Sequence, residues 1–255
     1  MNKRIINIVV VVAMVSGIMM LIRLSGPRLS FAPVEIVRIE RIEVIDDGLS
    51  ENNKMAELLA PYRQQASDIM SEVVGVAADT YEVGYPETPL TRLVAEMMLS
   101  EAQQTVCADV AISNIGGIRS TMYSGEVTVG DIYKILPFDN AMVVLQMRGS
   151  TLDSLATDIA VKGGAALAGM TFSVESDTTA VDVMVGCEPI DPNKIYRVVT
   201  NDYLSWGNDG FKAMSRYESA TALNVMLRDA MLHYIKVNDG KIIAPTDKCI
   251  RYRVL

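Results

Sequence analysis

The segment "SNIGGIRS" (residues 113–120) places two glycines and an arginine directly after an apolar run that predicts a buried strand. Loops at strand ends are the usual place for ligand sites. Gly116 and Gly117 permit positive φ and a close approach to the backbone, while Arg119 offers a planar fork of donors for phosphate or carboxylate. Asn114 supplies both a donor and an acceptor. Taken alone, the loop fits either a ligand site or a tight turn with a surface arginine.

Two later segments have the same character. "LPFDN" (136–140) carries Phe138 in a polar loop, where the ring is either core or a flat stacking face for a base. "TNDYLSWGNDGF" (200–211) reads as a long polar loop after a strand. In it, Tyr203 is a second stacking candidate, and Asp209 beside glycines is either an acceptor for sugar hydroxyls or part of a turn. Together the three loops favour a pocket for a nucleoside phosphate.

The order of helical and strand patterns predicts an α+β fold with a mixed sheet and packed helices. The helix from Pro89 carries apolar residues at helical spacing, which predicts a core-facing stripe of Leu90, Leu93, Val94, Met97 and Met98. Pro61 is expected to kink or break the first helix. The other expected helices are 52–72, 150–160 and 219–236, and residues 127–136 are expected to be a strand end followed by a short helix. The expected strands are one within 30–47 and the segments 73–79, 108–113, 141–149, 170–175, 180–185, 196–201 and 249–255.

Composition narrows the class of protein further. The chain has 255 residues, half of them hydrophobic, so it can bury a full core, and its net charge is −8. An acidic chain is a poor candidate for nucleic-acid binding, which needs a basic surface. Its three cysteines, Cys107, Cys187 and Cys249, are too far apart for a zinc knuckle. We interpret them as small buried residues, with one disulfide left open for an oxidising compartment.

The amino terminus has the pattern of a membrane-targeting segment. Residues 5–22 form an apolar run flanked by basic residues, and its length of roughly 27 Å as a helix is close to a bilayer core. Residues 1–29 are therefore either an uncleaved signal-anchor or a signal peptide. Residues 30–49 read as a linker and 50–255 as one domain. Either alternative puts that domain outside the cytoplasm, on the periplasmic side or the cell surface.

Several motifs occur in the order known from one family. "NIGGIRS", "GEVTVGDIYKILPFDNAMVVLQMRGSTL" (125–152) and "YRVVTNDYLSWGNDGF" (196–211), with "ETPLTRLVAEMM" (87–98) before them, resemble the C-terminal domain of 5′-nucleotidases and UDP-sugar hydrolases. The resemblance covers about residues 50–255. It implies a substrate-binding domain that recognises the nucleoside part of a nucleotide.

The resemblance also implies roles for individual residues. Phe138 and Tyr203 would clamp the base, and Asp209 would contact the ribose. The remaining ligand contacts would come from the glycine motif, namely Asn114, Gly116, Gly117 and Arg119. The chain departs from the family pattern in three places. Ile115 and Asn208 each replace a glycine, and Thr91 and Arg92 replace the usual Gly-Asn. Gly84 stands where several relatives have an arginine. One cationic contact to the ligand is therefore expected to be absent.

The resemblance places hydrolysis in a metallophosphoesterase domain that this sequence does not contain. A two-metal site needs several His, Asp and Asn ligands, and the one histidine, His233, lies far from the motif loops. We interpret His233 as a partly buried structural residue. No cofactor is expected in this chain, and divalent metals are expected only in a partner. Three hypotheses remain: the recognition subunit of a split 5′-nucleotidase, a stand-alone extracytoplasmic nucleotide-binding protein, and a scaffold with a decayed pocket.

Overall fold

The structure is a computed structural model that describes residues 53–176 and 178–252. The predicted targeting segment 1–29, the linker 30–49 and the strand expected within it lie outside the described residues. Across the described part of the chain, no helix combines the length and the apolar character needed to cross a membrane. The apolar run 5–22 is not among those residues.

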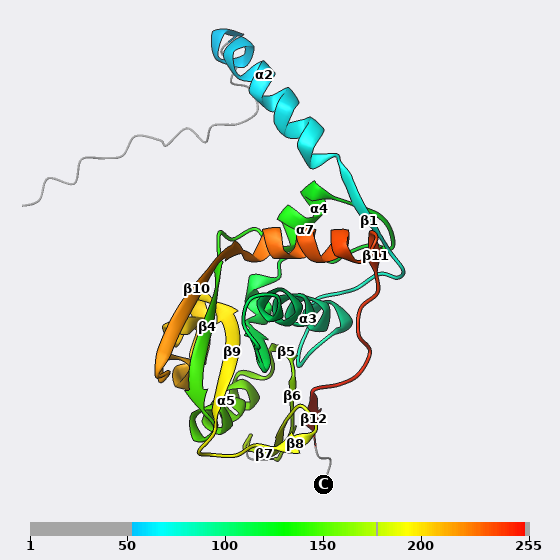
Figure 1. Cartoon of the computed structure of the whole chain (residues 1–255). Coiled ribbons are helices and arrows are strands. Elements are labelled where there is room, and N and C mark those ends of the chain that lie inside the picture. Colours follow the sequence, from blue (N-terminus) through cyan, green and yellow to red (C-terminus); the bar gives the residue numbers. More distant parts are fainter. Residues whose placement is uncertain (1–52, 177, 253–255) are drawn as a thin grey trace, which may run out of the picture. The chain divides into compact units, whose positions relative to one another are not determined.

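A five-stranded mixed sheet forms the centre of the fold (Figure 1). Its neighbours pair antiparallel except β2 and β9, which are parallel. In spatial order the strands are β10 (Ser219–Met226), β4 (Ala141–Arg148), β9 (Ile195–Asn201), β2 (Val110–Ser113) and β5 (Ala166–Ala168).

The inner strands β2 and β9 are largely buried on both faces, which explains why they read as continuous apolar runs. Because side chains alternate across a strand, Ala111 and Val199 join one hydrophobic cluster while Ile112 and Val198 join the other. Helix α3 (Pro89–Gln103) packs in the first cluster and α5 (Gly149–Lys162) in the second. The five apolar residues predicted for the α3 stripe are all fully buried.

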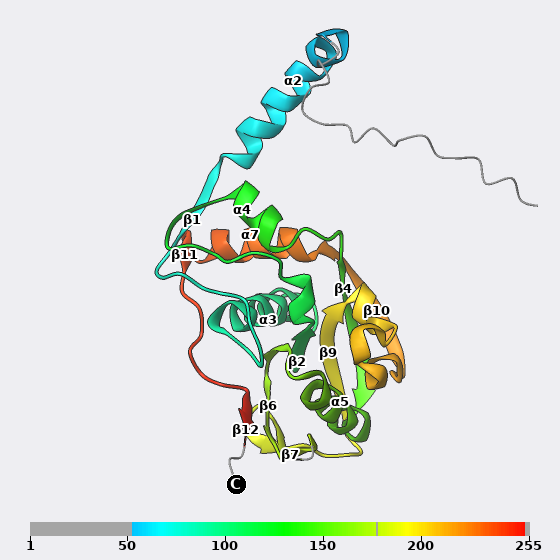
Figure 2. The same ribbon diagram turned by 180° about the vertical axis from the view of Figure 1, so that it is seen from behind.

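The remaining elements surround this core (Figure 2). α7 (Leu227–Val237) packs beside α3 on the first face, and α4 (Val129–Ile135) and α6 (Asp202–Ser205) are short helices. A three-stranded sheet contains β11 (Lys241–Ile242), β1 (Val73–Ala77) and β3 (Gly125–Thr128). A four-stranded sheet contains β12 (Ile250–Tyr252), β6 (Met170–Val174), β7 (Ala180–Val185) and β8 (Glu188–Pro189).

The first described helix, α2 (Asn53–Met70), extends away from the sheets, and its carboxyl end approaches α4 (Figures 1 and 2). Of the two effects expected of Pro61, a kink or a break, the break does not occur, because α2 continues through this residue. Pro61 removes the hydrogen bond to the Glu57 carbonyl, but both residues are exposed, so water can bond that carbonyl instead. The strand that follows, β1, is only partly buried, contrary to the buried strand expected there.

The prediction of one helix over 219–236 is also wrong in its first half. Residues 219–226 form β10, which pairs with β4, and only 227–237 are helical. Leu223 and Val225 alternate toward the core while their neighbours are exposed. Backbone pairing along the free edge of β4 thus outweighs the helical preference of the alanines in "SATALNVM".

Two further predictions need correction. Cys107 and Cys187 are exposed, so only Cys249 is a buried residue, and all three are free thiols. The first two flank strands rather than lying within them, which leaves their side chains in solvent.

Segment 200–211 is less irregular than expected, since it contains α6 and the 3₁₀ turn η2 (Asn208–Gly210). The Asn201 side chain starts α6 by accepting a hydrogen bond from the Leu204 amide at 2.8 Å.

Candidate ligand-binding site

The three loops singled out in the sequence meet around one cavity of about 410 Å³. This volume lies within the usual range for small-molecule sites, roughly 300–1,000 Å³. The structure brings all seven predicted residues to its wall and adds Asn140, which the sequence reasoning missed although it belongs to "LPFDN". The lining residues are Asn114, Gly116, Gly117, Arg119, Phe138, Asn140, Tyr203 and Asp209.

The glycine loop is a compact turn rather than a left-handed one. Residues Ile115–Gly117 form the 3₁₀ turn η1 at the end of β2, and neither Gly116 nor Gly117 is among the positive-φ residues. What Gly117 provides is close approach, because a Cβ there would lie 3.2 Å from Asn114 Oδ1. Gly117 thus leaves room for the Asn114 side chain at the cavity wall, and neither glycine uses the positive φ that it would permit.

Asn114 is held by a polar network at the base of the cavity. It is 7 % exposed, and its Nδ2 donates to Asp209 Oδ2 at 3.1 Å. Its Oδ1 accepts from Asn201 Nδ2 at 3.4 Å, and that same amide donates to Ser113 Oγ at 3.1 Å. Buried amides with satisfied partners are fixed in orientation, so Asn114 and Asp209 form a rigid polar wall.

Asp209 occupies a special backbone position. Its φ is 58°, and it lies between Gly207 and Gly210, which also have positive φ. Its Oδ1 accepts a hydrogen bond from Lys162 Nζ at 2.6 Å, and this bond raises the pKa of Lys162. Lys162 ends α5, 47 residues away, and nothing in the sequence pattern pointed to it.

Phe138 and Tyr203 present half-exposed rings at the cavity. Their exposed fractions are 49 % and 46 %, so neither ring is a core residue. The Tyr203 carbonyl accepts from Asn208 Nδ2 at 2.8 Å, which ties α6 to the turn that carries Asp209. Two aromatic faces that remain open to solvent beside one cavity are suited to stacking a planar group.

The loop that carries Phe138 is anchored by Arg228 of α7, which the sequence reasoning missed, as it missed Asn140 and Lys162. Its Nη1 donates to the carbonyls of Pro137 at 3.2 Å and Phe138 at 3.4 Å, and its Nη2 pairs with Asp139. The guanidinium also lies 4.4 Å from the centre of the Tyr133 ring, a favourable cation–π distance. Arg228 is therefore a positioning residue for the aromatic loop.

Arg119 is exposed and supplies the one positive charge of the lining. One of its nitrogens donates weakly to the Gly116 carbonyl at 3.3 Å, which leaves its other donors for a ligand. Asp209 is the one negative charge of the lining. The wall thus combines a cation, an anion, two amides and two aromatic rings, a set that can recognise a polar molecule with a planar ring and an anionic group.

His233 lies on α7, away from this cavity, and is partly buried as predicted. Its Nδ1 is 2.7 Å from Glu101 Oε2 on α3. Over residues 53–176 and 178–252, no three His, Cys, Asp or Glu side chains come close enough together to hold a metal ion. These residues do not fit the two-metal centre that the family resemblance implies, and no catalytic step is assigned to them.

Comparison with known proteins identifies the class of this domain. Residues 71–216 match the family described as "5'-nucleotidase, C-terminal domain". The chain is 27 % identical to protein UshA of Yersinia enterocolitica over 74 % of this chain and 35 % of that protein. It is 30 % identical to the NAD 5′-nucleotidase of Haemophilus influenzae over 62 % and 31 %. The chain thus spans about a third of the length of these curated relatives.

Solved structures agree with this assignment. The structure of the NAD nucleotidase of Haemophilus influenzae superposes with a TM-score of 0.64 at 26 % identity, over 79 % of this chain and 41 % of that one. A 5′-nucleotidase precursor from Thermus thermophilus has the same fold, with a TM-score of 0.69 at 23 % identity over 78 % of this chain and 43 % of that one. The chain belongs to the 5′-nucleotidase family, as the C-terminal domain of that family.

Proposed function

We propose that this chain is the nucleotide-recognition part of a 5′-nucleotidase-type hydrolase, in which a metallophosphoesterase on a separate chain hydrolyses the phosphate monoester. The observation that carries the proposal is the convergence of three loops on one cavity with two open aromatic rings, one cation and one anion. The names of the relatives, among them a NAD 5′-nucleotidase, support the substrate class.

The geometry suggests how a nucleotide would lie in the cavity. Its base would stack between Phe138 and Tyr203, because both rings are half-exposed at the lining. A ribose hydroxyl would donate to Asp209, whose carboxylate is already fixed by Asn114 and Lys162. The phosphate would accept from Arg119, since an arginine fork suits phosphate oxygens.

The proposed division of labour rests on the donor set, because the described residues contain no cluster of metal ligands. Metal ions held by the partner would stabilise the attacking and leaving oxygens of the displacement. In this proposal, the role of this chain is to bind the nucleoside and to present the phosphate to the partner phosphoesterase.

Calorimetric titration of the full chain with AMP and adenosine tests the recognition step, with neutral detergent present because of the apolar run 5–22. Calorimetry is preferable to tryptophan fluorescence, because Trp206 is 76 % exposed and does not line the cavity. We expect saturable binding of both ligands, with AMP favoured. Arg119→Met should weaken AMP binding and leave adenosine binding within about twofold. No binding of either ligand at millimolar concentration would favour the scaffold with a decayed pocket.

Reconstitution tests the partner. Adding a co-purified two-metal phosphoesterase should produce AMP hydrolysis that neither protein shows alone, and Phe138→Ala in this chain should lower it. Nucleotide binding without any such partner would favour the stand-alone nucleotide-binding protein. If this chain neither binds a nucleotide nor associates with a phosphoesterase, both the split-enzyme and the stand-alone binding hypotheses are contradicted.

We propose that the domain lies outside the cytoplasm and is held at the membrane through residues 5–22. The support is the apolar run between basic residues. Protease treatment of intact and opened cells tests this placement: we expect the domain to be exposed to protease from the extracytoplasmic side and to sediment with membranes if the segment is retained. A chain found in the cytosolic fraction would overturn it.

A further inference from the structure

A second cavity lies where the carboxyl-terminal segment crosses α3. It has a volume of about 370 Å³, and it shares no residue with the lining of the first cavity. One wall is the start of β6 with Thr171, another is the turn between β7 and β8, and the third is segment 247–251. Because the two linings have no residue in common, this second cavity is not part of the proposed nucleotide site.

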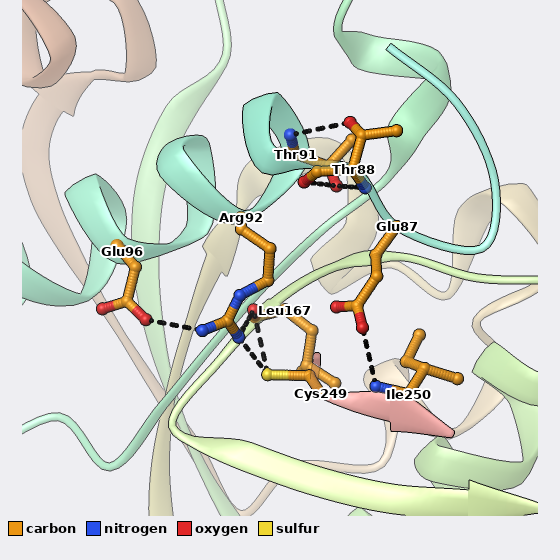
Figure 3. Close-up of polar contacts among 8 residues, drawn as sticks. All are labelled: Glu87, Thr88, Thr91, Arg92, Glu96, Leu167, Cys249 and Ile250. Carbon is orange, nitrogen blue, oxygen red and sulfur yellow. Dashed lines mark hydrogen bonds and ion pairs between the residues drawn. The ribbon is translucent and has the colours of Figure 1, made fainter. Parts of the chain in front are cut away.

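Arg92 of α3 lies deep in this cavity and is only 8 % exposed. Figure 3 shows its guanidinium between Glu96, the Leu167 carbonyl and Cys249. One nitrogen donates to Leu167 O at 2.8 Å and contacts Cys249 Sγ, and another pairs with Glu96 at 3.2 Å. The sequence reasoning noted Arg92 as a departure from the family pattern but gave it no function.

The partners of Arg92 are incomplete. Its Nε is buried and has no hydrogen-bond partner, and burial raises the pKa of Cys249 to about 12, so the thiol stays neutral beside it. An unpaired donor on a buried cation is rare in native proteins and calls for an acceptor from water or an ion. Glu96 is a third exposed and so compensates the charge only in part.

Two more cations border the same cavity. Lys248 and Arg251 both line it and both have exposed side chains. Three carboxylates lie near these three cations, and only Asp247 belongs to the lining. Glu96 pairs with Arg92, and Glu87 Oε1 accepts from the Ile250 amide at 2.9 Å (Figure 3). On a chain with a net charge of −8, a cavity bordered by three cations is a local exception.

We propose that this second cavity binds a small dianionic oxyanion of the phosphate type, with Arg92 at its floor and Lys248 and Arg251 at its rim. Arginine donates in a fork that matches tetrahedral oxyanions, and lysine adds a compact charge. The Thr171 hydroxyl offers a further donor from β6. Among the lining residues alone, three cations face the one carboxylate of Asp247, so a dianion matches the charge of the lining better than a monocarboxylate does. The site is independent of the proposed nucleotide pocket.

Calorimetry of the full chain with inorganic phosphate at low salt tests the proposal. Every protein carries Arg119→Met, which removes the arginine of the first cavity, so binding that remains belongs elsewhere. Adding Lys248→Met and Arg251→Met should weaken phosphate binding by at least about tenfold, because two charge-assisted contacts are lost. The matched control is Arg216→Met with Lys236→Met, two exposed cations outside the cavity, and it should bind phosphate within about twofold of the background.

Arg92→Gln is expected to weaken phosphate binding further, and its thermal unfolding is recorded first because Arg92 is buried. The rim pair keeps the test valid if Arg92→Gln does not fold, since Lys248 and Arg251 are exposed. The proposal is overturned if Arg119→Met alone abolishes phosphate binding, or if the rim pair binds phosphate as well as its matched control.

Discussion

Replacing Lys162 by methionine tests whether a distant cation holds the turn that carries Asp209. Lys162 Nζ lies 2.6 Å from Asp209 Oδ1, and the two side chains are 32 % and 24 % exposed. Asp209 has a φ of 58°, a conformation that costs a residue other than glycine on the order of 1–2 kcal/mol. The ion pair helps to offset this cost, together with the hydrogen bond that Asn114 Nδ2 donates to Asp209 Oδ2.

The expected magnitude follows from the partial burial of the pair. Exposed ion pairs contribute about 0.2–1 kcal/mol, whereas breaking a fully buried pair costs roughly 3–5 kcal/mol. For this intermediate case we expect Lys162→Met to lower the free energy of unfolding by about 1–2 kcal/mol. The exposed Lys236→Met is the matched control, and it should change stability by less than about 0.5 kcal/mol.

The assay is denaturant unfolding of wild type, Lys162→Met, Asp209→Asn and the double variant. Because the two residues are in contact, the cycle should give a coupling energy of about 1 kcal/mol. Nucleotide affinity should fall in parallel if Asp209 binds the ribose. The hydrogen bond to Asp209 raises the pKa of Lys162 above 10.5. The pair therefore stabilises the protein fully below pH 10.5 and loses its contribution as the pH rises through the folded-state pKa.

Two results would refute this reasoning. A coupling energy below about 0.3 kcal/mol is within the usual additivity error and would mean that the glycines alone hold the turn. A stability difference between wild type and Lys162→Met that persists unchanged well above the folded-state pKa would show that packing of the methylene stem, not the charge, is what matters.

Three further predictions concern the aromatic loop and the carboxyl-terminal segment. Phe138→Ala should weaken nucleotide binding roughly 5- to 150-fold, the equivalent of about 1–3 kcal/mol per stacked base. The control variant Tyr123→Ala should leave nucleotide binding unchanged, because Tyr123 is 72 % exposed and does not line the cavity. Equal affinities in calorimetry would exclude stacking on Phe138. Arg228→Met should lower the free energy of unfolding by about 2 kcal/mol, because two backbone carbonyls and the Tyr133 ring lose their contacts with the guanidinium. The same variant should also bind nucleotide more weakly. Nucleotide affinity equal to that of the wild type would mean that Arg228 does not position the loop. Burial raises the pKa of Glu87 above 4.5, although the Ile250 amide donates a hydrogen bond to its carboxylate. The wild type should therefore lose stability relative to Glu87→Gln as the pH rises from 4.5 through the raised pKa. Unfolding free energies of the two proteins that run parallel over this pH range would contradict the prediction.

The family, most strands of the sheet and the seven predicted residues of the cavity wall could all be inferred from the amino-acid sequence. These features are encoded locally, because strand alternation and helical spacing fix which side chains face the core. Two of the motif loops follow the parallel strands β2 and β9, and the third precedes β4, which is antiparallel to β9. The fully buried α3 stripe and the three loops around one cavity are examples. What the cavity binds remains a proposal.

The distant residues that complete the site could not be inferred from the sequence and became apparent in the folded chain. Lys162 meets Asp209 across 47 residues, and Arg228 reaches the Phe138 carbonyl across 90. Arg92 and Leu167 are 75 residues apart. Such contacts depend on how the chain closes, not on local spacing. The same reason explains β10, where the free edge of β4 converts a helix-like sequence into a strand. Local patterns fix which face of an element is buried, and tertiary pairing decides what each face meets.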